Sequence, residues 1–252
     1  MLKFFKLILT ISLSVSALTL PGISSAQEPL GFSVLSVEIK PGTNQQFEAF
    51  IRKFKEGAEN TNAANGWATS QTAVGNTSLY SFVSPFNSFE ELSTPVTALL
   101  GQAFTPFEAA EMLESFSEVV ISSTSGTYHA AANISKPAAE AIPNPEVISS
   151  IAVNINPGMQ IQFEAWVEKV VEASDGPTWN AFSKSFGEGP DYVFRTPGNW
   201  ALFDNGASSA QQRVLDEFGS REGQIIVDSG NAATQSRSNS LLTNRPDLSY
   251  TP

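Results

Sequence analysis

The 252-residue sequence contains no cysteine and a single histidine, His129. Without cysteine the chain has no disulfide, no thiolate nucleophile and no sulfur ligand for a metal. One histidine is too few for the common zinc and iron sites, which use several imidazoles or carboxylates. The sequence therefore predicts a protein with no metal and no cofactor.

Motifs of nucleotide and acyl chemistry are also missing. There is no P-loop, no Gly-x-Gly-x-x-Gly, no Gly-x-Ser-x-Gly and no EF-hand loop. Basic residues are scarce, and 14 Lys and Arg against 25 Asp and Glu give a formal charge of −11. Because this negative field repels phosphate backbones and anionic lipids, neither nucleic acid nor a membrane surface is an expected partner.

The first 26 residues have the pattern of a secretory signal peptide. Lys3 and Lys6 form a basic start, an apolar run follows over 7–20, and small residues lead to Ala26. The run is shorter than the roughly 20 apolar residues that span a bilayer, so we expect no stable membrane anchor. Cleavage after Ala26 would give a periplasmic or secreted protein.

The rest of the chain repeats itself. The stretches "VEIKPGTNQQFEAF" at 37–50 and "VNINPGMQIQFEAW" at 153–166 share Val, Ile, Pro-Gly, Gln and Phe-Glu-Ala at a constant offset. Further matched pairs are Trp67 and Trp179, Gly75 and Gly187, Tyr80 and Tyr192, and Phe82 and Phe194. A period of about 110 residues is too long for a solenoid and predicts a duplicated domain.

Both copies show the same order of elements. Apolar residues alternate with polar ones over 35–39 and 151–155, which predicts strands, and amphipathic helices follow each Pro-Gly. Thr43 with Gln46 suggests a capping box, and Asn156 an N-cap. Further strands are expected near 67–74, 78–83, 124–134, 178–186, 190–195 and 235–243, and further helices near 106–121 and 208–228. The order β-α-β-β-α-β is that of the ferredoxin-like fold.

An α+β fold of two ferredoxin-like units follows from this order. Each sheet carries helices on one face only, so two units can bury their other faces against each other as an intramolecular α/β barrel. The expected domains are a first unit at 27–134, a Pro/Ala-rich linker at 135–146 and a second unit at 147–252. An internal pseudo-dimer of this kind leaves a higher oligomer open.

These repeated turn and core residues resemble the dimeric α/β-barrel superfamily. The shared pattern is Val-x-Ile-x-Pro-Gly-x(4)-Phe-Glu, then an amphipathic helix and a strand led by Trp67 or Trp179. The superfamily includes antibiotic-biosynthesis-type monooxygenases, NIPSNAP-like and EthD-like proteins and haem-binding relatives. The resemblance covers nearly all of the chain after residue 26 and implies the fold rather than a particular activity.

The period of two in the strands selects the side chains that would face the barrel interior. This inward-facing set is Ser36, Glu38, Thr127, His129, Ala152 and Asn154. If the last strand of the first unit lies beside its first strand, His129 comes close to Ser36 or Glu38. A Glu38–His129 pair is then a candidate acid–base couple, and a histidine bonded to water or backbone at the rim is the alternative.

Other candidate residues lie at matched positions of the two copies or at positions where the two copies differ. The ligand-binding candidates are Trp67, Trp179, Tyr80, Tyr192, Ser36, Asn154 and Arg195. The paired aromatic residues suit either ligand stacking or the core. Arg195 has Val83 as its counterpart, so it is either a carboxylate-binding group in the lumen or a surface residue. The apolar insert 85–105 is either a lid over the barrel mouth or a helix packed on the sheet edge.

Three functions are compatible with this sequence. The leading one is binding of a small, partly apolar molecule in the barrel. The second is a cofactor-independent monooxygenase- or isomerase-like enzyme that uses His129, Glu38 and Arg195. The third is a non-catalytic interaction protein whose barrel is filled by its own side chains.

Overall fold

The structure is a computed structural model that describes residues 29–93, 96–138, 142, 145–173, 177–203 and 209–252. The expected signal peptide at 1–26 and part of the expected linker lie outside these ranges. Within the described ranges, no helix combines the length and the apolar character that crossing a bilayer requires.

Strands and helices are interspersed along both halves of the chain. The first half contains β1 (Gly31–Ile39), α1 (Asn44–Thr61), β2 (Ala68–Val74), β3 (Leu79–Phe86), the short helix η1 (Glu91–Ser93), α2 (Val96–Ala103), α3 (Pro106–Val119), β4 (Val120–Ala130) and η2 (Ala132–Ile134). The second half contains β5 (Val147–Ile155), α4 (Gln160–Glu172), β6 (Asn180–Gly187), β7 (Tyr192–Gly198), η3 (Trp200–Phe203), α5 (Ala210–Ala233) and β8 (Thr234–Asn244).

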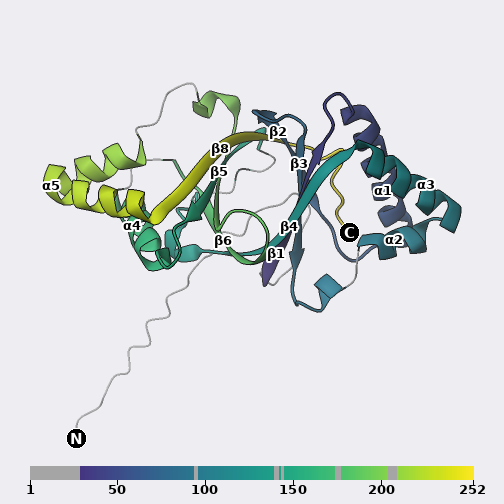
Figure 1. The fold of residues 1–252 in the computed structure, drawn as a ribbon, viewed down its shortest axis with the longest axis horizontal. Helices are drawn as coiled ribbons and strands as arrows, with labels where there is room; N and C mark the ends of the chain where they lie inside the picture. The colour runs from purple at the N-terminus through teal and green to yellow at the C-terminus, as the bar shows by residue number, and fades with distance from the viewer. Residues whose placement is uncertain (1–28, 94–95, 139–141, 143–144, 174–176, 204–208) are drawn as a thin grey trace, which may run out of the picture.

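The strands form one closed antiparallel barrel in the order β1-β3-β2-β8-β5-β7-β6-β4. The two halves of the chain meet where β2 pairs with β8 and where β4 pairs with β6. Helices α1, α2 and α3 gather at one side of the barrel, and α4 and α5 lie at the opposite side (Figure 1). The α+β class and the closed barrel expected from the sequence are confirmed.

Apolar side chains form cores on both sides of the barrel wall. Outside it, Val37, Ile39 and Phe47 belong to a core beneath α1, and equivalent residues of β5 and α4 form a second core in the other half. Inside the barrel, Phe32, Val83, Tyr128 and Phe182 form a smaller cluster. The two faces of the barrel wall therefore border different apolar environments, the large cores outside and the small cluster inside. The small cluster fills only part of the barrel interior.

The segment that follows the last strand of each half crosses to the other half. Lys136 pairs with Trp179 as an isolated bridge, and Tyr250 pairs with Trp67 in the same way. The indole N–H groups reinforce both crossings: Trp179 donates to the carbonyl of Ile134 at 2.8 Å, and Trp67 donates to that of Leu248 at 2.8 Å. Each tryptophan thus holds the tail of the opposite half.

The expected helix caps at the repeated Pro-Gly turns are wrong. Thr43 is the N-cap of α1 but makes no capping hydrogen bond through its side chain, and the N-cap of α4 is Met159 rather than Asn156. Gly42 and Gly158 have φ of 83° and 79°, so each turn ends in a left-handed residue. The N-cap residues that follow have ψ of 12° and 15°, far from the extended backbone that usually directs a capping side chain at N2 or N3.

Candidate functional site

The interior of the barrel holds a cavity of about 240 Å³. Every strand contributes at least one lining residue, and the turn between β6 and β7 contributes Glu188, Gly189 and Pro190. The volume corresponds to about eight water molecules at liquid density. The barrel is therefore not filled by its own side chains, which argues against the filled-barrel alternative.

One part of the cavity wall is apolar. Phe32 and Phe182 meet edge to face with ring centroids 5.6 Å apart, although they belong to opposite halves of the chain. Val83 and Tyr128 complete this cluster, and Val34 and Val193 pack against it. A hydrocarbon or aromatic group fits this part of the cavity, because it exchanges water contacts for apolar ones.

The other part of the wall carries hydroxyl groups. The lining hydroxyl residues are Ser36, Thr72, Ser81, Thr124, Ser150, Ser238 and Ser240. The inward orientation predicted for Ser36 is confirmed, and so is that of Ala152. Thr72 has its hydroxyl oxygen buried with no hydrogen-bond partner among the described residues. A buried polar atom without a partner is unfavourable, so this hydroxyl is a local cost of the cavity wall.

Arg195 projects from β7 into the cavity. On the barrel wall it lies directly opposite Ser150 of β5 and Asn180 of β6. It is the only cation among the described residues of the lining, and Glu188 is the only carboxylate. Burial lowers the pKa of the Arg195 guanidinium, and the nearby Tyr128 partly opposes that shift. A guanidinium remains protonated at neutral pH, so the cavity carries a fixed positive charge.

The turn between β6 and β7 closes against Tyr128 at one end of the cavity. The Tyr128 hydroxyl donates to the carbonyl of Pro190 at 3.2 Å. Gly189 has a φ of 107°, and a Cβ placed on it would lie 2.5 Å from that hydroxyl. Burial raises the pKa of Tyr128, and the negative charge of Asp191 adds to the effect. The positive φ of Gly189 favours glycine at this position, and a larger side chain there would have to displace the Tyr128 hydroxyl.

The placement expected for His129 is wrong. The β1–β4 register sets Phe32 opposite Tyr128 and Glu38 opposite Ser122, so His129 and Glu38 are at opposite ends of the strand pair. His129 is exposed, and its ring nitrogens lie 2.9 Å from Ser185 Oγ and 2.7 Å from Ser183 Oγ. The even-numbered residues of β4 line the cavity instead. The structure thus does not form the proposed acid–base couple.

Glu38, Thr127 and Asn154 also lie outside the cavity lining. Glu38 accepts hydrogen bonds from Asn76 at 2.7 Å and from Ser122 at 3.3 Å. Asn154 donates to Ser236 at 3.0 Å. These contacts connect neighbouring strands, so a ligand role for Glu38 and Asn154 gains no geometric support.

The repeated aromatic residues belong to the outer cores. Tyr80 and Tyr192 are fully or almost fully buried, and their hydroxyls donate to Glu48 at 2.9 Å and to Glu164 at 2.5 Å. Trp179 is buried in the core of the second half. The core alternative therefore fits these three residues. The sequence contained the signal for the tyrosine–glutamate pairs, because Glu48 and Glu164 are the repeated glutamates of Phe-Glu-Ala.

A second, larger hollow of about 810 Å³ lies outside the barrel. Phe54, Trp67, Phe86 and Phe186 contribute aromatic surface to it, and η1 and α2 form another wall. The insert 85–105 therefore borders this outer groove, and none of its described residues beyond β3 lines the barrel cavity, so the lid alternative gains no geometric support. Of the predicted aromatic ligand residues, Trp67 borders this outer groove, whereas Trp179, Tyr80 and Tyr192 line neither it nor the barrel cavity.

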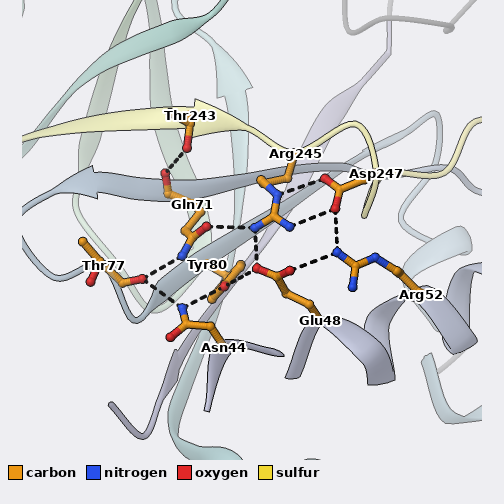
Figure 2. Close-up of polar contacts among 9 residues, drawn as sticks. All are labelled: Asn44, Glu48, Arg52, Gln71, Thr77, Tyr80, Thr243, Arg245 and Asp247. Carbon is orange, nitrogen blue, oxygen red and sulfur yellow. Dashed lines mark hydrogen bonds and ion pairs between the residues drawn. The ribbon is translucent and has the colours of Figure 1, made fainter. Parts of the chain in front are cut away.

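The densest cluster of charged side chains lies beside α1 (Figure 2). Arg245, in the tail after β8, contacts Glu48, Asp247 and Gln71, and Arg52 contacts Glu48 and Asp247 as well. These ion pairs lower the pKa of both carboxylates, with Arg245 as the main cause. Because its charged groups all have partners, the cluster fixes the tail onto α1 and is not a candidate ligand site. The described residues also contain no group of three or more His, Asp or Glu side chains suited to a metal.

Comparisons with solved structures identify the fold. An anthrone oxidase-like protein matches 89% of this chain and 94% of its own, at 14% identity and a TM-score of 0.53. A mutant chlorite dismutase from Candidatus Nitrospira defluvii matches 88% and 94%, at 8% identity and a TM-score of 0.50. The chain has the dimeric α/β-barrel fold. No family model matches its sequence, and no curated protein does either.

Proposed function

We propose that the barrel interior binds a small, partly apolar organic molecule. The observation that carries the proposal is the cavity of about 240 Å³, which is apolar around Phe32 and Phe182 and hydroxyl-lined elsewhere. Mixed walls of this kind are typical of ligand sites, where apolar surface gives affinity and a few polar groups give orientation.

Native mass spectrometry of protein purified from its own host tests this function directly. We expect a retained molecule in the wild type and its loss in Ala152→Leu, because the larger side chain fills the cavity. Ala110→Leu makes the same change on an exposed face of α3 and serves as the control. Equal occupancy of all three proteins would contradict a site in the barrel.

A cofactor-independent oxygenase is the second candidate function. Its support is the outer groove, whose volume and aromatic residues suit a flat aromatic substrate, together with the fold shared with an anthrone oxidase-like protein. Oxygen consumption with anthrone tests it. One O₂ oxidises one anthrone to anthraquinone, in which one oxygen atom of O₂ becomes the new quinone oxygen and the other is released as water. We expect Trp67→Leu to lower the rate and Trp200→Leu, at an exposed tryptophan, to leave it unchanged. No consumption by the wild type would exclude this reaction.

We also propose that residues 1–26 direct export and that residues 27–134 and 147–252 derive from one duplicated ferredoxin-like unit. The support is the basic and apolar start of the chain and the recurrence of Pro-Gly, Phe-Glu-Ala and the tyrosine–glutamate pair in both halves. N-terminal sequencing of the protein from a periplasmic or culture fraction tests the export step. We expect the chain to begin at Gln27, and a start at Met1 in that fraction would contradict cleavage.

A further inference from the structure

Arg195 is a half-buried cation with no counter-ion among the described residues. No hydrogen bond or ion pair of its guanidinium involves any described residue, although the tyrosine ring of Tyr128 is close enough to interact electrostatically. An isolated buried charge is costly, and proteins normally pair it. The accessible surface that Arg195 retains borders the cavity.

From this arrangement we infer that the cavity takes a monoanionic carboxylate, with Arg195 as its counter-ion and the apolar cluster around Phe32 and Phe182 as the site of its hydrocarbon part. The inference rests on the proposed function and assigns the ligand class. A planar guanidinium matches a carboxylate with two parallel hydrogen bonds, which provides both charge and orientation.

Neighbouring side chains can complete the coordination of such a carboxylate. Arg195 lies directly opposite Ser150, and Ser150 lies opposite Ser240, so three polar side chains form a row across β7, β5 and β8. All three line the cavity. No described residue bonds the hydroxyls of Ser150 or Ser240, which leaves both free to donate to a ligand oxygen.

The charge balance favours a single negative charge on the ligand. Arg195 is the sole cation of the described lining, so a dianionic phosphate would keep one negative charge uncompensated inside the barrel. Glu188 opposes a second negative charge further, because it is the carboxylate at the turn that borders the cavity. A monoanion with an apolar body matches both parts of the wall.

Paired probes of the same shape test the ligand class. Isothermal titration calorimetry of the full chain would compare phenylacetate with the neutral 2-phenylethanol and with phenyl phosphate. We expect phenylacetate to bind about tenfold or more tightly than 2-phenylethanol, because a charge-assisted pair replaces a neutral hydrogen bond. Equal binding of acid and alcohol, or tighter binding of phenyl phosphate, would overturn the monoanion and leave small-molecule binding in place. Binding of none of the three would contradict the proposed function itself.

Variants assign the preference to Arg195. We expect Arg195→Met to bind acid and alcohol equally and to keep the affinity for the alcohol, whereas Arg195→Lys should keep a reduced preference for the acid. Arg237→Met, at an exposed position of β8, is the matched control and should behave as the wild type. If Arg195→Met retains the full preference for phenylacetate, Arg195 is not the counter-ion. Circular dichroism of each variant would confirm that the fold is intact.

Discussion

At the scale of single residues, two arginines of this protein have opposite electrostatic surroundings. Arg245 is surrounded by carboxylates, and these contacts raise its pKa. Arg195 has no carboxylate partner among the described residues, and burial lowers its pKa. Charges that stabilise a fold are normally paired, so an unpaired charge at Arg195 costs stability, as expected if the proposed ligand supplies its counter-ion.

The first prediction concerns the stability cost of Arg195. Replacing an unpaired, half-buried charge by an apolar side chain of similar length removes the cost of desolvating that charge, so the change should be neutral or stabilising. We therefore expect Arg195→Met to raise Tm of the ligand-free protein by a few degrees, measured by circular dichroism. A clear decrease in Tm would mean that Arg195 supports the fold through contacts other than those described here.

The second prediction concerns pH. The folded-state pKa of Glu48 is lower than its ordinary value of 4.5, so its ion pair adds stability above that pH, and this stability is lost as the pH falls below it. Glu48→Gln should lower the free energy of unfolding by about 2 kcal/mol at pH 7 and by less at pH 3, measured by urea denaturation. Glu56→Gln, at an exposed position of the same helix, is the control. An equal loss at both pH values would contradict an ionic role.

At the scale of the elements, alternation in the sequence predicts the strands but not always their orientation. In β1 the apolar residues Val37 and Ile39 alternate with Ser36 and Glu38. This contrast assigns the apolar residues to the core beneath the helices and the polar face to the barrel side. In β4 the run over 122–125 is Ser-Ser-Thr-Ser, so it offers no apolar contrast. The structure resolves the orientation through Tyr128, which packs with Phe32 and Phe182 inside the barrel and turns His129 outward.

Helix caps give the third prediction. Thr105 caps α3 with a complete capping box, in which Glu108 N donates to Thr105 Oγ1 and Thr105 N donates to the Glu108 carboxylate at 3.0 Å. Thr43 makes no such bond at the start of α1. Thr105→Ala should cost about 1 kcal/mol of unfolding free energy, and Thr43→Ala distinctly less, measured by urea denaturation. Equal costs would show that the cap geometry does not decide the stability of these helix ends.

At the scale of the whole molecule, the repeat predicts the barrel but not the exchange of tails, in which the segment after the last strand of each half packs on the other half. Two equivalent sequences imply two equivalent sheets, and their apolar faces require cover, so closure follows from simple burial. The pairing of Trp67 with Tyr250 joins residues at distant points of the chain, and no local pattern marks it. The proposed ligand site depends on the same closure, since Arg195 and Phe32 lie in opposite halves and both line the cavity.

The fourth prediction is that both halves unfold together. Leu248 is fully buried in the core of the first half, although it lies in the tail of the second. Leu248→Ala should cost about 2–5 kcal/mol and shift a single transition, with tryptophan fluorescence and circular dichroism coinciding. Leu113→Ala, at an exposed leucine of α3, is the control. Two separate transitions in the wild type would contradict this coupling.

The exchanged tails also determine the order in which native contacts can form while the polypeptide is synthesised. Trp179 pairs with Lys136, a partner translated before it, whereas Trp67 pairs with Tyr250, a partner translated long after it. The first half therefore obtains one of its core side chains, Leu248, only after the second half has been translated. A nascent chain therefore cannot complete the core of the first half before the second half has emerged from the ribosome.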